Sequence, residues 1–388
     1  MVKAAGIYIH IPFCERKCTY CNFNTTDFFD DLAARFAGAV TREIACTGEL
    51  LSGHSPVTVD TIYFGGGTPS IVEPDHLASL IGETRRAFDV VDKAEITIEI
   101  NPATFTREKI VAWVAAGINR ASVGAQSFID RELSSLSRTH TAVDTLRTVE
   151  QLREAGLQNI SLDLIAGLPG QRLPDWRLNL GRALDLRPEH LSLYLLEIKE
   201  GTQLYAQLKR RKVEQPDDDL AADMYNMICD ATAEAGYEQY EISNFALAAP
   251  GIQTSSLRSK HNMKYWTGAP FYGMGCGAHS YDGRARWINI LKTESYIEEV
   301  NRTGRAVAER RELTGDERAS EALFMGLRLV EGIDLDAFCL EYGLDVREKF
   351  RDELARLEEA GLVRISETRL ALTGKGRLLS NEVFVHFI

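Results

Sequence analysis

The 388-residue sequence contains no apolar run that approaches the roughly 20 residues of a membrane-spanning helix. Its first residues, Met1 to Ala5, lead directly into a strand-like run, without the apolar segment that marks a secretory signal. Repeats and low-complexity tracts are also absent. These features predict a protein that does not insert into a membrane and that resides in the cytoplasm.

Positive charge is in deficit as well. The sequence has 44 Lys and Arg against 56 Asp and Glu, which gives a net charge of −12. Such a balance argues against non-specific binding to nucleic acid or to an anionic membrane surface. We therefore expect no nucleic-acid partner, although a local basic pocket is compatible with this charge.

The seven cysteines do not form pairs in the sequence. Four of them are scattered along the chain: Cys46, Cys229, Cys276 and Cys339. An odd, scattered set argues against a disulfide framework and favours a reducing cytosol. The other three are grouped as Cys14-x-x-x-Cys18-x-x-Cys21, and no fourth cysteine follows closely.

The grouped cysteines predict a metal centre. Three thiolates in eight residues can hold three irons of a four-iron cluster, which leaves one iron open to a substrate. The alternatives are a zinc site with His10 as the fourth ligand, because zinc favours four Cys or His ligands, and unliganded thiols. The number and type of the ligands favour the iron–sulfur cluster.

Short apolar strands alternate with longer segments of helical periodicity, which predicts an α/β fold with parallel strands and right-handed crossovers. Six strands fall short of the eight in a closed barrel, so we predict an incomplete, TIM-like (β/α)6 barrel or a strongly curved open sheet. The six runs are Ile7–Ile11, Thr61–Phe64, Glu95–Ile100, Arg120–Gly124, Asn159–Ile165 and His190–Leu196.

The character of the sequence changes twice after the sixth strand. A helical segment at Asp217–Gly236 precedes residues 238–290, which are rich in glycine, aromatics and turn signals. From Thr314 onward the pattern becomes two or three helices and a two-stranded ribbon, which resembles a winged-helix module. We therefore predict a partial barrel at 1–235, a barrel extension at 236–313 and a winged-helix-like α+β module at 314–388.

Unusual residues follow five consecutive predicted strands, at the edge where parallel α/β sheets place their sites. Packing explains one such residue more easily than five in a row. They are the three cysteines, the loop Gly65–Pro69, Glu99 with Asn101, Gln126 and Asp163. The glycine loop alone predicts either a tight turn or a close approach of the backbone to a small ligand, and its place beside the cysteines favours the ligand.

At this point the chain resembles a known family. Tyr8-x-His10-Ile11-Pro12-Phe13-Cys14-x-x-x-Cys18-x-Tyr20-Cys21, followed by Gly65-Gly66-Gly67-Thr68-Pro69, is similar to the radical S-adenosylmethionine (SAM) superfamily. Within it, the chain resembles the branch that contains oxygen-independent coproporphyrinogen III dehydrogenase and the HemW heme chaperones. The resemblance covers most of the chain, and the combined motifs are highly specific.

The resemblance implies a [4Fe–4S] cluster on Cys14, Cys18 and Cys21, with SAM at the open iron. The SAM contacts that it implies are Gly66, Gly67 and Thr68 at the methionine end, Tyr8 and Tyr20 beside the cofactor, and Glu99, Gln126, Arg138 and Asp163. Carboxylates suit ribose hydroxyls or an ammonium group, and arginine suits a carboxylate. The alternative for Arg138 is a solvated helix position. Burial of Asp163 without a partner would be costly, which favours a function for it.

Two features favour the heme chaperones within this branch. The dehydrogenase has a further cysteine two residues beyond the third, where this chain has Phe23. The run His261-Asn262-Met263-Lys264-Tyr265-Trp266 matches the H-N-x-x-Y-W motif associated with heme binding in HemW proteins. Histidine is a common heme ligand and aromatic rings pack against a porphyrin, but Tyr265 and Trp266 can equally hold this segment against the barrel.

Two further patterns predict structure rather than ligand binding. Gly273-x-Gly275-x-Gly277 lacks the spacing of a nucleotide-binding loop, so we expect a close-packed loop that closes the barrel. A candidate recognition helix at Asp345–Ala360 carries four basic and six acidic residues, and would repel phosphates. We therefore expect the C-terminal module to be a lid or a partner surface.

Together these features predict a radical-SAM-type heme chaperone that binds a [4Fe–4S] cluster, SAM and heme. By resemblance it would deliver heme to acceptor hemoproteins such as respiratory enzymes, and it would need an electron donor. The alternatives are a radical SAM enzyme that acts on a tetrapyrrole and a zinc-stabilised binding module. No catalytic residue is assigned, and the sequence leaves both a monomer and a homodimer open.

Overall fold

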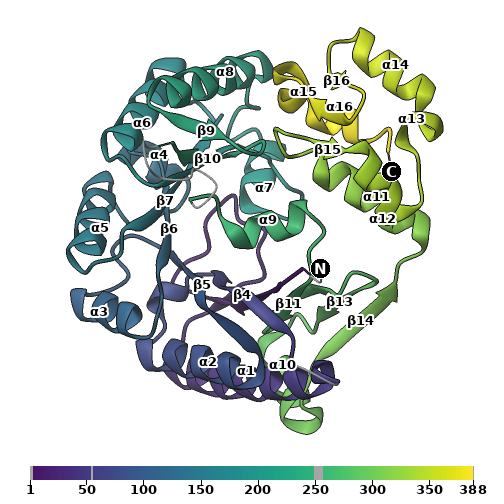
Figure 1. The fold of residues 1–388 in the computed structure, drawn as a ribbon. Helices are drawn as coiled ribbons and strands as arrows, with labels where there is room; N and C mark the ends of the chain where they lie inside the picture. The colour runs from purple at the N-terminus through teal and green to yellow at the C-terminus, as the bar shows by residue number, and fades with distance from the viewer. Residues whose placement is uncertain (1–2, 54–55, 249–256, 388) are drawn as a thin grey trace.

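The six predicted strands form the centre of the fold. The computed structural model describes residues 3–53, 56–248 and 257–387. Six parallel strands lie side by side in chain order, and helices cover their outer face (Figure 1). They are β1 (Ala5–Ile11), β4 (Thr58–Gly66), β5 (Asp89–Ile100), β6 (Arg120–Gln126), β7 (Asn159–Ala166) and β8 (His190–Leu195). The predicted α/β partial barrel is confirmed.

Amphipathic helices make the crossovers between these strands. The helix α5, Ala142–Glu154, shows why: a capping box between Thr141 and Asp144 starts it, and its buried positions Thr145, Val149 and Leu152 recur at helical spacing. The other crossover helices are α1 (Asp30–Ser52), α2 (Pro74–Ala87), α3 (Arg107–Ala115), α4 (Asp130–Ser135) and α6 (Leu173–Asp185). Two further helices, α7 (Gln203–Lys209) and α8 (Asp218–Glu234), follow β8.

The strands are buried on both faces. In β1, Ile7 and Ile9 belong to the main hydrophobic core, whereas the alternate residue Tyr8 stacks on Tyr63 of β4 and contacts His261. Because successive side chains of a strand point to opposite faces, the isoleucines pack beneath the helices and the aromatic residues face the barrel interior. The interior is therefore polar and aromatic, and the apolar core lies outside it.

The predicted extension at 236–313 contributes strands to both edges of the sheet. At one edge β10 (Asn244–Leu247) pairs antiparallel with β8, and β9 (Tyr237–Gln239) pairs with β10. At the other edge β11 (Phe271–Met274) pairs parallel with β1 and is followed by three antiparallel strands: β12 (His279–Tyr281), β13 (Ala285–Asn289) and β14 (Val307–Glu312). The resulting 12-stranded sheet stays open between β9 and β14.

The connections beside these strands have two notable features. The helix α9, Lys260–Trp266, lies between the two edges, and α10, Thr293–Thr303, packs on α1 (Figure 1). At Gly275, with φ of 96°, an added Cβ would lie 2.6 Å from the carbonyl oxygen of His10. The glycine cluster is thus the close-packed loop that its spacing predicts.

The C-terminal residues have a separate hydrophobic core. Strands β15 (Ile333–Asp334), β16 (Val363–Ile365) and β17 (Arg369–Leu372) form a three-stranded sheet, in which β16 and β17 are the predicted ribbon. The helices around it are α11 (Gly315–Gly326), α12 (Leu335–Tyr342), α13 (Val346–Lys349), α14 (Arg351–Glu359), α15 (Gly374–Leu378) and α16 (Ser380–Phe384). In the described ranges no helix is long and apolar enough to cross a membrane.

The prediction of one helix at Asp345–Ala360 was wrong. The chain leaves helical geometry at Phe350, where φ is −114° and ψ is 29°, and this residue separates α13 from α14. The Phe350 ring packs edge-on against Phe387, with 5.1 Å between the ring centroids. Packing of this partly buried ring against the small C-terminal core accompanies the break in the helix.

Candidate functional site

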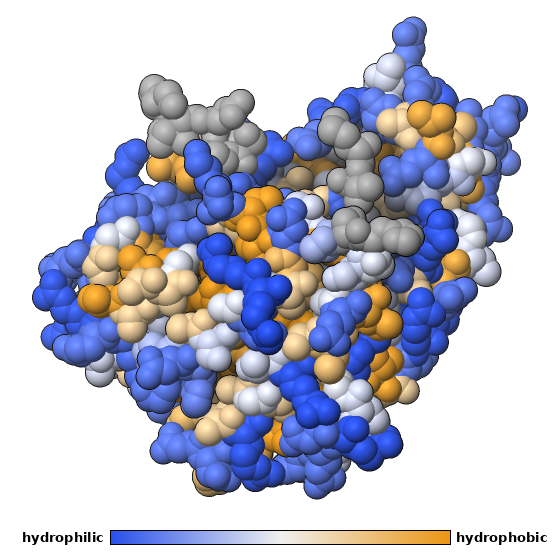
Figure 2. All heavy atoms as spheres, turned by 60° about the horizontal axis from the view of Figure 1, so that its bottom comes forward, coloured by the Kyte–Doolittle hydropathy of each residue, from blue (hydrophilic) through white to orange (hydrophobic). Residues whose placement is uncertain are grey.

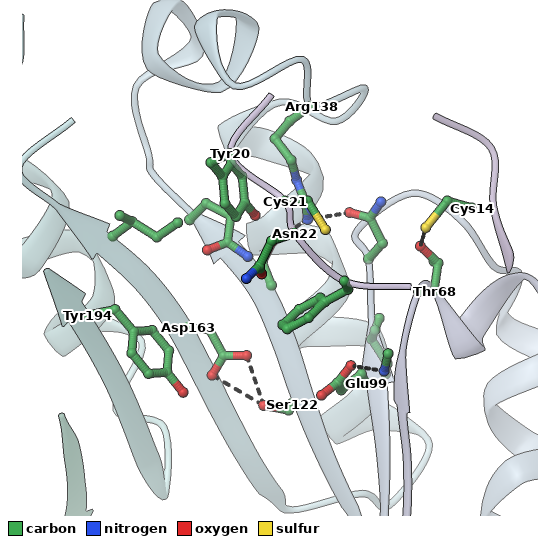
Figure 3. Close-up of a pocket in the computed structure, with 18 of the residues that line it drawn as sticks. Cys14, Tyr20, Cys21, Asn22, Thr68, Glu99, Ser122, Arg138, Asp163 and Tyr194 are labelled. Carbon is green, nitrogen blue, oxygen red and sulfur yellow. Dashed lines mark hydrogen bonds between the residues drawn. The ribbon is translucent and has the colours of Figure 1, made fainter. Parts of the chain in front are cut away.

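A cavity of about 400 Å³ opens at the carboxyl ends of the parallel strands (Figure 3). The loop after β1 and the ends of β4 to β8 all contribute to its wall, as expected where parallel strands end together. The predicted site residues that line it are Cys14, Tyr20, Cys21, Gly66, Gly67, Thr68, Glu99, Gln126, Arg138 and Asp163. Residues up to 149 positions apart in the sequence thus share one cavity, which we call the rim cavity.

The cysteine loop and the glycine loop are tied together by the backbone. The N–H groups of Gly67 and Thr68 donate to the carbonyl oxygens of Ile11 and Phe13, each at 2.8 Å. The Thr68 hydroxyl lies 3.5 Å from the sulfur of Cys14. The short strands β2 (Phe13–Cys14) and β3 (Thr26–Asp27) close the base of the cysteine loop. The two motifs therefore form one rigid corner of the rim cavity.

The glycines of this corner are required by packing as well as by the cavity. Gly66 has φ of 112°, and an added Cβ would lie 2.4 Å from the His10 ring. A Cβ on Gly67 would lie 2.6 Å from the carbonyl oxygen of Phe13. Because both glycines also line the cavity, the tight-turn and ligand-approach interpretations of this loop apply together.

The thiols of the loop differ in their surroundings. Burial raises the pKa of the Cys14 thiol to about 11 and also raises that of Cys21. The third thiol, Cys18, lies outside the cavity lining, and its sulfur is 3.6 Å from Nη1 of Arg138. A bound cation reverses this preference for the neutral thiol, because metal coordination deprotonates thiols outright.

The donor set fits an iron–sulfur cluster better than a single zinc ion. In residues 3–53, 56–248 and 257–387, no three His, Cys, Asp or Glu side chains are placed to hold a single metal ion. A four-iron cluster does not require this, since each thiolate binds a different iron. The zinc alternative needs His10, yet its Nε2 is 2.8 Å from the Asn24 carbonyl oxygen and its Nδ1 is 3.1 Å from the Tyr8 hydroxyl.

Arg138 is not a solvated helix residue. It follows α4 and is only partly exposed. Its Nη2 donates to the carbonyl oxygen of Gly124 at 2.6 Å and to Oδ1 of Asn101 at 2.5 Å. Burial disfavours the charge, but the neighbouring Tyr20 and Cys18 outweigh burial and raise the pKa of the guanidinium. A fixed positive charge therefore stands beside the cysteine loop, where it can pair with an anionic ligand group.

Two carboxylates lie below Tyr20 and Arg138 in the same cavity (Figure 3). Glu99 accepts from the Tyr63 hydroxyl at 2.9 Å and from the Gly66 N–H at 3.0 Å, and burial raises its pKa to about 7. Asp163 accepts from the Ser122 hydroxyl at 2.9 Å and from Ser161 at 3.2 Å, and burial raises its pKa as well.

Asp163 therefore has hydrogen-bond partners, without which its burial would be costly. The serines satisfy part of its hydrogen-bonding capacity, so burial by itself does not require a ligand. What still favours a binding role is position, since this carboxylate faces the rim cavity together with Glu99.

The sequence reasoning missed the end of the sixth strand. Tyr194 of β8 and the following Glu197 and Lys199 also line the rim cavity, and Ser122 supports Asp163 from β6. The strand-end rule that selected the first five strands applies equally to β8 and would have found these residues.

Tyr8 lies away from the rim cavity. It points into the barrel interior, and its hydroxyl is 3.1 Å from Nδ1 of His10. Burial raises the pKa of Tyr8. In this arrangement Tyr8 does not contact the rim cavity directly. It supports His10, which packs against Gly66.

The predicted heme segment forms α9, which closes the opposite end of the barrel. His261 is buried, with Nδ1 2.9 Å from the Thr61 hydroxyl and Nε2 3.0 Å from the Tyr265 hydroxyl. Its ring stacks on Tyr63, with 5.0 Å between the centroids. Burial lowers the pKa of His261 to about 3, so the ring is neutral at pH 7.

The remaining residues of this segment hold it in place. The Ser259 hydroxyl caps α9 by accepting from the Asn262 N–H at 3.3 Å. The guanidinium of Arg328 lies 4.4 Å from the centre of the Trp266 ring, so this residue connects α9 to the C-terminal module. In this arrangement the aromatic residues attach the segment to the barrel, and neither ring nitrogen of His261 is free to bind iron.

Comparison with known proteins agrees with the geometry. The Radical SAM superfamily matches residues 8–178, and the HemN C-terminal domain matches residues 313–379. The heme chaperone HemW of Bacillus subtilis (strain 168) is 35% identical over 98% of both chains. The heme chaperone HemW of Lactococcus lactis is 30% identical over 100% of this chain and 98% of that protein.

A relative from another organism and a solved structure extend this picture. Radical S-adenosyl methionine domain-containing protein 1, mitochondrial, of Danio rerio is 34% identical over 85% of this chain and 74% of that protein. The solved structure of coproporphyrinogen III oxidase (HemN) from Escherichia coli superposes with a TM-score of 0.85 at 24% identity, covering 100% of this chain and 90% of that one. The chain belongs to the radical SAM superfamily, in the branch with a HemN C-terminal domain that includes the HemW proteins.

Proposed function

We propose that this protein is a radical-SAM-type heme chaperone, which binds heme and passes it to acceptor hemoproteins. The observation that carries the proposal is the 35% identity to a HemW heme chaperone over 98% of both chains. A likeness of this extent includes both the barrel and the C-terminal module. We also propose that the protein works in the cytoplasm, that it receives electrons from a donor, and that its heme acceptors include respiratory enzymes.

In this proposal Cys14, Cys18 and Cys21 hold a [4Fe–4S] cluster, and SAM occupies the rim cavity. When bound, the cluster can supply an electron to the sulfonium group of SAM. Gly66, Gly67 and Thr68 bind the methionine end, Glu99, Gln126 and Asp163 accept or donate hydrogen bonds, and Arg138 pairs with an anionic group. A cavity of about 400 Å³ is within the range of small-ligand sites.

Phe23 supports the chaperone over the dehydrogenase. Its side chain is exposed and lines the rim cavity at the position where the dehydrogenase has its further cysteine. A phenyl ring can supply neither a thiol nor a proton. The cysteine loop of this chain therefore lacks the further thiol that the dehydrogenase has at this position.

An anaerobic heme-transfer assay tests the proposal. The chain is reconstituted with iron and sulfide, loaded with hemin and mixed with an apo-hemoprotein that has a distinct Soret spectrum. We expect the acceptor spectrum to appear faster than with free hemin at equal concentration. Failure to bind hemin, or transfer no different from that of hemin alone, would contradict the proposal.

A second candidate is a radical SAM enzyme that acts on a tetrapyrrole. The observation that favours it is the polar rim cavity, with two half-buried carboxylates and Arg138. Coproporphyrinogen III, SAM and a reductant are added to the reconstituted chain, and products are separated by chromatography. Decarboxylated porphyrinogen together with 5′-deoxyadenosine would establish the enzyme, and unchanged substrate supports the chaperone.

A further inference from the structure

Two buried residues, His190 and Tyr240, lie behind Asp163 in the barrel interior, and nothing above assigns a role to either of them. Asp163 faces the rim cavity from β7 (Figure 3). Two residues earlier on the same strand, Ser161 points to the same side of the sheet, because successive side chains of a strand alternate. In the register of the sheet, Ser161 lies beside His190 of β8, and both are 1% exposed.

Four hydrogen bonds connect Asp163 with the start of α9. The Ser161 hydroxyl donates to Oδ1 of Asp163 at 3.2 Å and lies 2.8 Å from Nδ1 of His190. Nε2 of His190 is 2.8 Å from the hydroxyl of Tyr240, which accepts from the backbone N–H of Ser259 at 3.3 Å. We call Ser161, His190, Tyr240 and Ser259 the interior relay.

The far end of the interior relay belongs to α9. Ser259 is the N-cap residue of that helix, and its hydroxyl accepts from the Asn262 N–H at 3.3 Å. Tyr240 follows β9 and lies outside the lining of the rim cavity. The interior relay therefore connects one wall of the rim cavity with the closed end of the barrel.

The chemistry of the groups sets the direction of these hydrogen bonds. Burial lowers the pKa of His190 well below its ordinary value, so the ring is neutral and has one donor and one acceptor nitrogen. Burial raises the pKa of Tyr240, so the phenol keeps a proton that it can donate to Nε2. Nδ1 then donates to Ser161, whose own proton is free for Asp163. The opposite tautomer would turn the Ser161 proton toward His190 and leave the carboxylate with one donor fewer.

Donors that point the same way reinforce one another. Each hydrogen bond polarises the next, and the effect is larger in an interior of low dielectric than in water. The interior relay therefore stabilises the charged form of Asp163 and fixes the orientation of its carboxylate toward the cavity. Simple satisfaction of buried polar groups explains each bond separately, but it predicts no effect on a ligand.

We propose that His190 and Tyr240 are positioning residues for Asp163, and that through them the closed end of the barrel contributes to SAM binding in the rim cavity. This inference rests on the proposed SAM site, in which Asp163 is one of the binding residues. Neither positioning residue touches the ligand. They keep Asp163 ionised and oriented as an acceptor for a hydroxyl or an ammonium group.

Calorimetric titration of the reconstituted full chain with SAM tests the role of His190. His190→Leu should weaken SAM binding about fivefold, as expected for one polarised hydrogen bond. His190→Asn keeps a donor near the position of Nδ1 and should weaken binding only about twofold, whereas His190→Gln reaches Tyr240 instead and should behave like His190→Leu. If SAM affinity follows the free energy of unfolding in all three variants, without specific rescue by asparagine, the role of His190 is structural and the inference fails.

Tyr240→Phe tests the part of the interior relay that is farther from the cavity. It should weaken SAM binding about twofold, as His190→Asn does, because both changes remove the phenol proton and keep a donor to Ser161. The matched control Tyr237→Phe, on β9, removes a buried hydroxyl that donates to the Pro188 carbonyl oxygen at 2.6 Å, outside the relay. This control should keep SAM affinity, and an equal loss in both tyrosine variants would contradict the inference.

Nitrogen NMR of the full chain, labelled at its histidines, examines the relay without any ligand. The signal that disappears in His190→Asn should be that of a neutral ring protonated at Nδ1. A ring proton on Nε2 would contradict the direction of the relay.

The outcomes separate this inference from the site on which it rests. If the unchanged chain binds SAM and both His190→Leu and Tyr240→Phe bind it equally well, the interior relay does not position Asp163, and the proposed SAM site stands. If the unchanged chain binds no SAM, both proposals fail together.

Discussion

Both ends of the barrel contain hydrogen-bonded polar side chains, but only those at the carboxyl rim also face a cavity. At the carboxyl rim, Glu99, Asp163 and Arg138 are held by neighbouring residues and still face a cavity of about 400 Å³. At the other end, His261 is hydrogen-bonded to Tyr265 and to Thr61 of β4. The presence of polar residues therefore does not by itself identify a ligand-binding site. Polar groups that face open space, with hydrogen-bonding capacity still available, do identify one.

Figure 2 shows a face on which hydrophilic and hydrophobic residues alternate in small areas. Scattered apolar residues on a surface are normal and carry no function by themselves. The rim cavity is different because its apolar and polar residues converge on one enclosed volume.

The largest expected effect at the carboxyl rim is loss of the cluster when a cysteine is replaced. Cys14→Ala should abolish the cluster, since only two thiolates would remain for four irons. Iron and sulfide content and the visible absorbance after anaerobic reconstitution measure the effect. Cys339→Ala, in the C-terminal module, should keep the full cluster content, and equal loss in both variants would argue against the cysteine loop as the ligand set.

At the closed end of the barrel, the largest expected effect is a loss of stability when His261 is replaced. His261→Ala deletes a buried ring with two hydrogen bonds and a stacking contact, so we expect a loss of about 3–4 kcal/mol in the free energy of unfolding. Urea denaturation measures it. Hemin affinity of the folded variant separates the two interpretations of this segment: an unchanged affinity supports a structural role for His261, and a loss of tenfold or more supports a heme contact.

Acid should destabilise the closed end of the barrel through His261. The pKa of His261 is lowered to about 3 from 6.5, so its buried neutral form stabilises the fold above pH 6.5. As pH falls from 6.5 toward 3 that stability is lost, because the unfolded chain binds a proton that the native ring does not; the slope approaches ~1.4 kcal/mol per pH unit. Unfolding measured from pH 7 to 4 should show a shallower slope for His261→Asn.

A smaller effect is expected for a single SAM contact. Asp163→Asn should weaken SAM binding about tenfold, equivalent to ~1.4 kcal/mol, because one charge-assisted hydrogen bond is lost. Calorimetry on the reconstituted chain measures this affinity. The control Asp144→Asn changes an exposed capping carboxylate of α5 and should leave SAM affinity unchanged, whereas equal losses would point to a general effect on folding.

The smallest effect is expected at Tyr8. Tyr8→Phe removes the hydroxyl near His10 but no atom of the rim cavity, so SAM affinity should change less than twofold. The free energy of unfolding should fall by about 1 kcal/mol for one lost hydrogen bond. A tenfold loss of SAM affinity would instead place Tyr8 in the binding site.

Local patterns in the sequence were sufficient for some of these features. The strands and the ribbon at Val363–Leu372 were found because apolar periodicity and turn signals are local. Phe350 was missed as a helix break because its partner, Phe387, lies 37 residues away. The orientation of α9 depends on Thr61, Tyr63 and Glu95, which are even more distant in the chain.

The sequence by itself determined the fold class, the cysteine loop and the strand ends that carry polar residues, because each is a short pattern with one compatible geometry. Only the tertiary structure decided which of these side chains face a cavity. It placed Asp163 on the rim with serine partners and turned Tyr8 and His261 into the barrel. The physical reason is that open hydrogen-bonding capacity depends on which distant residues become neighbours, and the periodicity of a chain does not contain that information.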